Sequence, residues 1–451
     1  MSVILIKVIQ FFVSLSLLVM IHEFGHYIAA RIFKIRVEKF YLFFNPWFSI
    51  YKRKIGDTTY GVGWLPLGGY VSLSGMIDES MNVEQMKQKP QPWEFRTKPA
   101  WQRLIVMLAG VFMNVILAMF IYACMLFTWG EEYLDNNNVK YGYEFSAAGE
   151  ELGFEDGDRI VSIDGKKIVN ANNIGTQLLI ADNDRNVEII RHGEAMTLSI
   201  PLDKLVDMRD SESYKGLYNP IVAPLIVDSA STQSASMAGF RHGDQIVGVG
   251  DKAIYSGELI RNELANYKDQ DVDIVVLRYQ TDSLGQSLAM RETLTTHINS
   301  EGQIGVTLQP VEEIKLTHIE YGFFESIPAG IKLAGKEIAS YWNQLKMIIN
   351  PDTKLYKEVG GFLSIGGVFP DTWDWRDFWR ITALISIMLA VMNLLPIPGL
   401  DGGHALFTIW EIITRRKPSD KFMEVMQWIG LILLFALLIY ANGNDIFKLF
   451  K

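Results

Sequence analysis

Apolar residues gather in four stretches of the chain, each about long enough to cross a lipid bilayer. These stretches are residues 3–20, 104–127, 381–400 and 425–441, with 18, 24, 20 and 17 residues. A membrane-spanning helix needs roughly 20 mainly apolar residues, because the hydrocarbon core is about 30 Å thick. We therefore predict four transmembrane helices. The first runs into a polar motif without a signal-peptide cleavage site.

Between the second and third stretches, the pattern changes to short alternating apolar and polar runs. Residues 153–165 and 239–251 repeat each other at an offset of 86, each with a Gly-Asp turn followed by an alternating strand. Such alternation predicts β-strands that are buried on one face. The repeat indicates a duplicated small domain, in which Asp156 and Asp158 are turn residues and not a metal-binding pair.

Charge predicts the orientation of the chain. The net charge is −9, and residues 127–375 carry 21 Lys and Arg against 38 Asp and Glu. Basic residues dominate 31–103 and recur after residue 400, which the positive-inside rule places in the cytoplasm. Both termini and the acidic middle then lie outside. The single cysteine, Cys124, excludes a disulfide framework. The sequence contains no basic domain, so we do not expect nucleic-acid binding.

The first stretch ends in His-Glu-Phe-Gly-His, residues 22–26. Residues four apart share one face of a helix, so His22 and His26 can bind one metal ion. Glu23 lies beside them, where a general base would be needed. An ionisable group inside the bilayer costs roughly 2.5–3.5 kcal/mol on insertion scales, and a bound metal would offset this cost. A helix-end side chain that only reaches water is the alternative.

The third stretch ends in Asn-Leu-Leu-Pro-Ile-Pro-Gly-Leu-Asp-Gly-Gly-His, residues 393–404. Its prolines must break the helix, which membranes tolerate only where the break is buried in protein or lines a cavity. At about 1.5 Å per residue, His22 and Asp401 reach similar depths, about 27 and 30 Å. Asp401 is thus the expected third protein ligand of a zinc ion. His404 is a rival ligand, and Asp401 could instead cap a turn. Asn393 could bind substrate or another helix.

Together the two motifs resemble the site-2 proteases, a family of intramembrane zinc metalloproteases. Both motifs are complete and stand on separate spans in the family's order. The resemblance implies one Zn²⁺ ion held by His22, His26 and Asp401, with Glu23 as catalytic base and Asn393 in contact with substrate. It also implies cleavage of single-span membrane proteins that another protease has already shortened, such as anti-sigma factors and remnant signal peptides.

The repeated turn and strand resemble the PDZ signature and imply PDZ domains at about 128–220 and 221–310. PDZ domains bind extended peptides by strand addition. Site-2 proteases with tandem PDZ domains resemble this chain throughout; they act in the bacterial inner membrane during envelope stress. The resemblance implies that the pair gates substrates with a large external part. Two alternatives remain for how the pair does this. The PDZ domains could bind peptide C-termini or extended segments, or they could exclude substrates by their bulk.

Two connecting regions complete the expected architecture. The sequence of residues 55–76 predicts a β-hairpin that re-enters the membrane. Its edge strand could pair with an unwound substrate. A hairpin at the protein surface is the alternative. The candidate substrate-binding residues in it are Gly61, Gly63, Gly68 and Gly69. The linker 311–375 contains an amphipathic helix, 328–349, expected on the outer membrane surface or on the PDZ pair. Segment 360–367 resembles a glycine-rich family segment only loosely.

The expected fold is therefore an α-helical membrane protein with two inserted, mainly β domains. Its membrane parts are residues 1–127 and 376–451. Two other functions stay open: a catalytically silent PDZ adaptor, which has no use for buried ionisable groups, and a zinc protease that cuts peptides at the membrane surface. Four histidines of the external segment are expected at the surface: His192, His242, His297 and His318.

Overall fold

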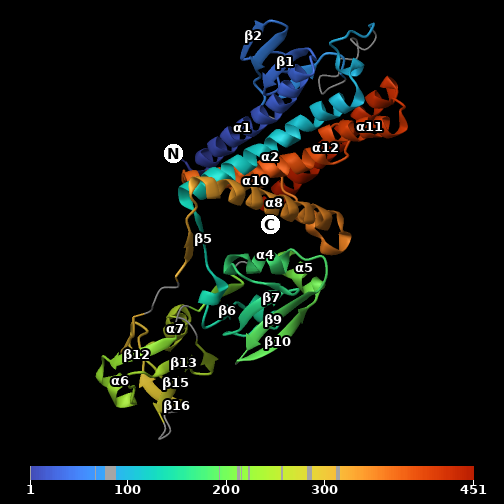
Figure 1. Cartoon of the computed structure of the whole chain (residues 1–451). Helices are drawn as coiled ribbons and strands as arrows, with labels where there is room; N and C mark the ends of the chain where they lie inside the picture. Colours follow the sequence, from blue (N-terminus) through green and yellow to red (C-terminus); the bar gives the residue numbers. More distant parts are fainter. Residues whose placement is uncertain are drawn as a thin grey trace. The chain divides into compact units, whose positions relative to one another are not determined.

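The computed structural model describes residues 2–66, 68–76, 88–191, 193–210, 214, 216–221, 224–254, 257–281, 287–310 and 315–450. The chain forms two compact units (Figure 1). One unit combines the two ends of the chain, Met1–Glu131 and Ile319–Lys451, and the other is the middle, Glu132–His318.

Four helices among the described residues are long and apolar enough to cross a membrane, as the sequence predicts. They are α1 (Val3–Ile32), α2 (Ala100–Trp129), α10 (Trp375–Leu394) and α12 (Asp420–Leu449). Helix α10 ends before Pro396 and Pro398, because proline cannot continue the backbone hydrogen bonds of a helix. A further helix, α11 (Asp401–Thr414), follows the break.

The helices of this unit pack closely on α2. In Figure 1, α1, α2 and α10 run alongside one another, and α8 (Phe323–Ile349) crosses them. A Cβ on Gly25 of α1 would lie 2.4 Å from the carbonyl oxygen of Ala109 in α2. A Cβ on Gly330 of α8 would lie 2.5 Å from the backbone nitrogen of Ala123. The helix expected at 328–349 thus begins at Phe323 and packs on the membrane helices.

A four-stranded sheet follows α1 and differs from the hairpin expected at 55–76. The strands are β1 (Val37–Leu42), β2 (Tyr51–Ile55), β3 (Thr58–Val62) and β4 (Tyr70–Leu73), in the order β2-β3-β1-β4. The hairpin prediction is wrong because β1, which precedes that segment, inserts between β3 and β4. It pairs parallel to β3 and antiparallel to β4. The hairpin that does form joins β2 and β3.

The loop after β1 satisfies its polar groups internally. Asn45 Nδ2 donates to Ser49 Oγ at 3.1 Å, Tyr70 Oη donates to Asn45 Oδ1 at 2.8 Å, and Trp64 Nε1 donates to the Pro46 carbonyl at 2.8 Å. The outer surface of this loop is apolar, and Trp47 is 91% exposed. On the α1 side, Phe43 and Pro66 border a hollow that is otherwise lined by Phe12, Val13, Ser16, Leu17, Met20 and Leu42.

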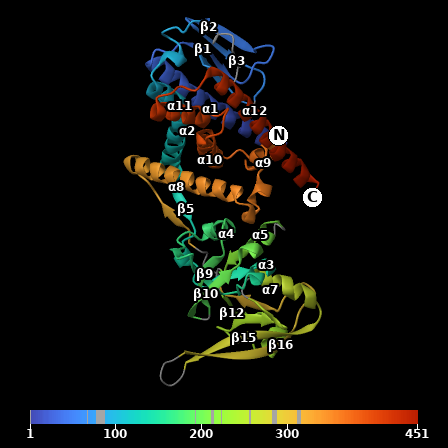
Figure 2. The ribbon, with the colours of Figure 1, turned by 90° about the vertical axis from the view of Figure 1, so that its right-hand side faces the viewer.

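The C-terminal part of α12 holds the segment at 360–367, which contains the short helix α9 (Phe362–Gly367). Asp445 of α12 accepts hydrogen bonds from the backbone nitrogens of Leu363 and Ser364 at 3.0 and 3.1 Å. Asn442 Oδ1 accepts one from the Phe362 nitrogen. Figure 2 shows α9 beside the C-terminal end of the chain. The glycine-rich segment is therefore attached to the end of α12.

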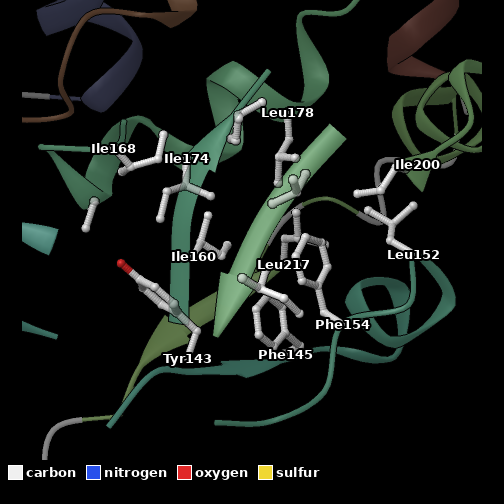
Figure 3. Close-up of a cluster of buried hydrophobic side chains, with 14 of the residues drawn as sticks. Tyr143, Phe145, Leu152, Phe154, Ile160, Ile168, Ile174, Leu178, Ile200 and Leu217 are labelled. Carbon is white, nitrogen blue, oxygen red and sulfur yellow. The ribbon is translucent and has the colours of Figure 1, made fainter. Parts of the chain in front are cut away.

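The middle unit contains two β-rich repeats, each with its own hydrophobic core. The first has the sheet β10-β9-β7-β8 and a separate pair of β6 and β11. Its elements are β6 (Tyr143–Phe145), α3 (Ala147–Glu151), β7 (Arg159–Ile163), β8 (Lys166–Lys167), α4 (Ile174–Leu179), β9 (Arg185–Arg191), β10 (Glu194–Ile200), α5 (Leu202–Asp210) and β11 (Tyr218–Pro220). Figure 3 shows its core, where the rings of Phe145 and Phe154 stack at 4.6 Å.

The second repeat has the path β16-β15-β13-β12-β17, with β14 paired to β13. Its elements are β12 (Leu225–Ala230), α6 (Gln233–Ala238), β13 (Gln245–Val249), β14 (Lys252–Ala253), α7 (Gly257–Leu264), β15 (Asp271–Thr281), β16 (Ser287–His297) and β17 (Val306–Leu308). Strands β5 (Glu131–Tyr133) and β18 (Thr317–Ile319) pair where the chain enters and leaves the middle unit.

The same buried ion pair recurs in both repeats. Arg191 donates to both carboxylate oxygens of Asp158 and to the Gly153 carbonyl, at 2.7–2.8 Å. Arg278 donates in the same way to Asp244 and to the Gly239 carbonyl, at 2.7–3.0 Å. Matched partners in a turn and a distant strand support a duplication.

Asp156 and the histidines of this unit have other surroundings. Asp156 Oδ1 accepts a hydrogen bond from the Phe145 nitrogen at 2.7 Å. The side chains of His242 and His297 are 70% and 51% exposed, and His318 is also exposed. The fourth histidine, His192, lies outside the described residues.

Candidate metal centre

Three side chains from two distant segments converge between the membrane helices. Helix α1 presents His22 and His26 four residues apart, and Asp401 is the first residue of α11. Oδ2 of Asp401 lies 3.1 Å from Nε2 of His22 and 3.3 Å from Nε2 of His26, and the two Nε2 atoms are 3.2 Å apart. Both histidines are buried, and Asp401 is largely shielded from solvent.

The triangle has the dimensions of a zinc site. Tetrahedral zinc with bonds of about 2.0–2.1 Å requires ligand atoms about 3.3 Å apart. The three edges of 3.1–3.3 Å agree with this spacing. Oδ2 of Asp401 is buried. The two imidazole nitrogens lie close to it, and it has no other hydrogen-bond partner among the described residues. Electron-rich atoms this close to one another fit a bound cation.

The broken helix places Asp401, and the glycines beside it make the turn possible. A Cβ on Gly402 would lie 2.2 Å from the Leu395 carbonyl oxygen, and one on Gly403 would lie 2.4 Å from that of Ile397. Only glycine therefore allows the 395–400 segment to fold back onto the start of α11. Among the described residues, one cluster of His, Cys, Asp or Glu side chains is compact enough to hold a metal ion. It contains Asp401 and not His404, the rival third ligand.

Glu23 and Asn393 face the same cavity as the three converging residues. The cavity measures about 100 Å³ and is lined by all five of these side chains. Val71 of β4 lines this cavity together with Glu23. Nδ2 of Asn393, in the last turn of α10, lies 3.5 Å from Nε2 of His22. The structure thus brings the sequence-predicted acid, amide and metal-binding groups together.

The four glycines expected to bind substrate do not share one place. A Cβ on Gly69 would lie 3.6 Å from Cγ of Glu23, so this glycine borders the site. A Cβ on Gly61 would meet the Tyr41 ring, whereas one on Gly63 or Gly68 would meet Phe44. These three glycines serve close packing within the sheet and its loop, and the segment that lines the cavity is β4 itself, through Tyr70, Val71 and Leu73.

Comparison with known proteins agrees with this geometry. The family model described as Peptidase family M50 matches residues 10–437, which include all of the converging residues. The chain belongs to peptidase family M50, the site-2 proteases. As an M50 peptidase, it is a membrane-embedded zinc metalloprotease.

Named relatives align with the M50 chain over almost its whole length. The "Regulator of sigma E protease" of Haemophilus influenzae is 27% identical over 465 residues, which cover 98% of each chain. The protein of the same name from Salmonella typhi is 27% identical over 97% of this chain and 98% of its own. A Vibrio cholerae protein named "Putative zinc metalloprotease" is 27% identical over 100% of both chains.

Helix α2 supplies a part of the M50 site that the motifs do not reveal. The Val106 carbonyl oxygen lies 2.8 Å from Nδ1 of His26, and Nδ2 of Asn114 lies 3.4 Å from Nδ1 of His22. Between them, a Cβ on Gly110 would lie 2.4 Å from Nε2 of His26. The available signal in the sequence was Asn114, the one amide in the uncharged stretch 104–127.

Proposed function

We propose that this chain is an endopeptidase that cuts single-span membrane proteins within or near their transmembrane segments. The observation that carries the proposal is the convergence of His22, His26, Asp401 and Glu23 between helices apolar enough to span a membrane. Its substrates would be spans already shortened by another protease. Two relatives are named regulators of sigma E, which favours anti-sigma-type proteins, and remnant signal peptides have the same form.

His22, His26 and Asp401 would hold the zinc ion, since their three atoms have the required spacing. Bound zinc supplies a Lewis acid that polarises the scissile carbonyl and makes water acidic enough to ionise near neutral pH. The Glu23 carboxylate takes the proton of the attacking water and returns it to the leaving amine. Asn393, which lines the same cavity, can donate from its amide to a substrate oxygen.

The edge strand β4 is suited to hold the substrate beside Glu23. It is the last strand of the order β2-β3-β1-β4, so among the described strands only one of its sides is paired. A transmembrane helix must unwind before its peptide bonds can be hydrolysed, and its freed backbone groups then need partners that lipid cannot supply. We propose that an unwound substrate segment pairs with β4.

The loop after β1 supports re-entry of this sheet into the membrane. Its polar side chains are bonded to one another, and its exposed side chains, led by Trp47 and Phe48, are apolar. Phe43 and Pro66 line one hollow together with the apolar residues Phe12 and Val13 of α1, well inside the predicted span. Irregular backbone is tolerated in a bilayer only when such internal partners are present.

The proposed orientation follows from the basic segments. Residues 31–103 and the loop after α11 would face the cytoplasm of a bacterial inner membrane, and the middle unit and both termini the periplasm. Single cysteines in a Cys124→Ser background can test this. With an impermeant maleimide on intact spheroplasts, we expect Ser229→Cys to react and Ser419→Cys to stay protected. The reverse labelling would overturn the orientation.

The middle unit would act as a gate built from two PDZ domains. Its two β-rich repeats, the shared arginine–aspartate pair and the repeated turn sequence support this assignment. We propose that it excludes substrates that still carry a large external domain, whether by bulk or by engaging a peptide end.

Cleavage by reconstituted protein tests the proposed function. The substrate is a truncated single-span protein in lipid vesicles, and the enzymes are the wild type and Glu23→Gln. We expect the wild type to cut inside the span and the variant to be slower by about 10²–10⁴-fold, because a general base contributes that much. Both proteins should hold one zinc ion by inductively coupled plasma measurement. Equal cleavage by both proteins would show that Glu23 is not the general base. Activity in protein that contains no zinc would contradict the metal assignment.

A further inference from the structure

Helix α2 faces the histidine pair with three residues spaced by four, Val106, Gly110 and Asn114. All three are buried, and residues at this spacing form one stripe along a helix. Val106 contributes a backbone carbonyl oxygen, Gly110 contributes free space, and Asn114 contributes a side-chain amide. The stripe therefore contacts both imidazoles.

The contact of His26 shows what a metal-binding histidine needs here. The Nδ1 atom of His26 lies 2.8 Å from the Val106 carbonyl oxygen, which can only accept a hydrogen bond. Nδ1 must therefore carry the proton, so Nε2 presents a lone pair to the metal. Metal-binding histidines generally donate their second nitrogen in this manner, which fixes the tautomer and the ring orientation.

His22 needs an equivalent acceptor, and Asn114 is the side chain in place to supply it. When Nδ2 of Asn114 faces Nδ1 of His22 at 3.4 Å, Oδ1 is buried without a hydrogen-bond partner among the described residues. That orientation also makes Nδ1 an acceptor, which puts the proton on Nε2 and blocks the metal. A half-turn of the amide brings Oδ1 to Nδ1 and removes this conflict.

We propose that Asn114 is a positioning residue of the metal centre, which accepts a hydrogen bond from Nδ1–H of His22 and thereby keeps Nε2 free for zinc. The inference rests on the proposed role of His22 as a ligand. Asn114 touches neither the metal nor the substrate in this arrangement and acts only through the imidazole. Ser386 of α10 bonds the backbone oxygen of Asn114, at 2.8 Å, and not its amide. Ser386 thus offers a matched control.

Zinc affinity of the full-length protein tests the inference, measured by competition with a chromophoric chelator in detergent. We expect Asn114→Leu, a near-isosteric apolar change, to weaken zinc binding by about 10–100-fold, the usual loss for such a partner. Asn114→Asp should retain wild-type affinity, because a carboxylate accepts the same hydrogen bond. Ser386→Ala should also retain it. The visible spectrum of the Co²⁺-substituted protein should change for Asn114→Leu alone, and Asn114→Ala repeats the comparison if the leucine variant fails to accumulate.

Two results would overturn the inference. One is wild-type zinc affinity in Asn114→Leu. The other is an equal loss of zinc affinity in Asn114→Leu and Asn114→Asp, together with a lower melting temperature of both metal-free variants. This combination would indicate a packing defect. Failure of the proposed function looks different, because wild type and His26→Ala would then bind the same amount of zinc.

Discussion

Individual glycines determine how closely the helices approach at the metal centre. Gly25 lies inside the His-Glu-Phe-Gly-His motif and lets α1 contact the backbone of α2 at Ala109. Gly110 on α2 then faces the nitrogens of His22 and His26 with no side chain between. The motif glycine and the α2 glycine together leave the volume that the ion needs.

Gly110→Ala should remove most zinc binding while the protein still folds. The added methyl would lie 2.4 Å from Nε2 of His26 and 2.8 Å from Nε2 of His22, inside the space of the ligand atoms. Overpacking of this kind costs about 1–3 kcal/mol, which the imidazoles can relieve by turning away. The measurement is zinc content after purification. Gly335→Ala on α8, where a Cβ meets nothing within 4 Å, should leave it unchanged. Full zinc in Gly110→Ala would refute this account.

At this scale the sequence predicts the residues that carry chemistry and misses those that arrange them. His22, Glu23 and His26 follow from spacing on a helix, and Asp401 from a proline break at matched depth. Asn114 and Gly110 act through the face that α2 turns toward α1, and a uniformly apolar stretch does not indicate which face that is. The sequence does not reveal that Gly61 and Gly63 serve packing, because the residues they pack against lie earlier in the chain, in β1 and its loop.

Among the elements, β4 offers the sharpest test, since the described strands pair with only one of its two sides. If an unwound substrate adds to β4, alternate residues of the substrate point their backbone groups at the strand. N-methylation of one alternate set in a substrate-derived peptide should weaken its competition with cleavage by about tenfold, since each lost hydrogen bond is worth about 0.5–1.5 kcal/mol. Methylation of the other set should have little effect. Equal behaviour of the two sets would exclude strand addition.

The elements show why local patterns predict some structure and not the rest. The end of α10 follows from Pro396, since proline acts on its own neighbours. The order of the sheet does not, because the parallel pairing of β1 with β3 depends on contacts across a loop. The sequence pattern also did not predict helix α11. It starts directly after the break and is too short to be recognised as a span.

For the whole molecule, the division into two units separates the metal centre from the middle unit that we propose as the gate. Every residue of the metal centre lies in Met1–Glu131 or Ile319–Lys451. The middle unit enters and leaves through the paired strands β5 and β18, so a short linker can replace it. This arrangement allows the middle unit to be removed without cutting the unit that holds the metal centre.

Replacement of residues 134–316 by a Gly-Ser linker should leave zinc content and cleavage of a shortened substrate unchanged. Cleavage of the same substrate with a large folded external domain should rise toward that of the shortened one, because the excluding unit is gone. Gel-based cleavage assays in vesicles measure both. If the intact substrate stays resistant while the shortened one is cut, the middle unit is not the gate.

The contact of Asp401 with the two histidines also affects how long the protein survives. Its carboxylate and the imidazoles come from opposite ends of the chain, and they lie 3.1–3.3 Å apart. A ligand that binds only the folded state stabilises it in proportion to the logarithm of its free concentration. A zinc ion held by these three residues would therefore tie the two terminal halves of the membrane unit together. Under metal starvation, we expect a pulse-chase experiment to show faster turnover of the whole polypeptide, so that scarcity lowers its abundance as well as its activity.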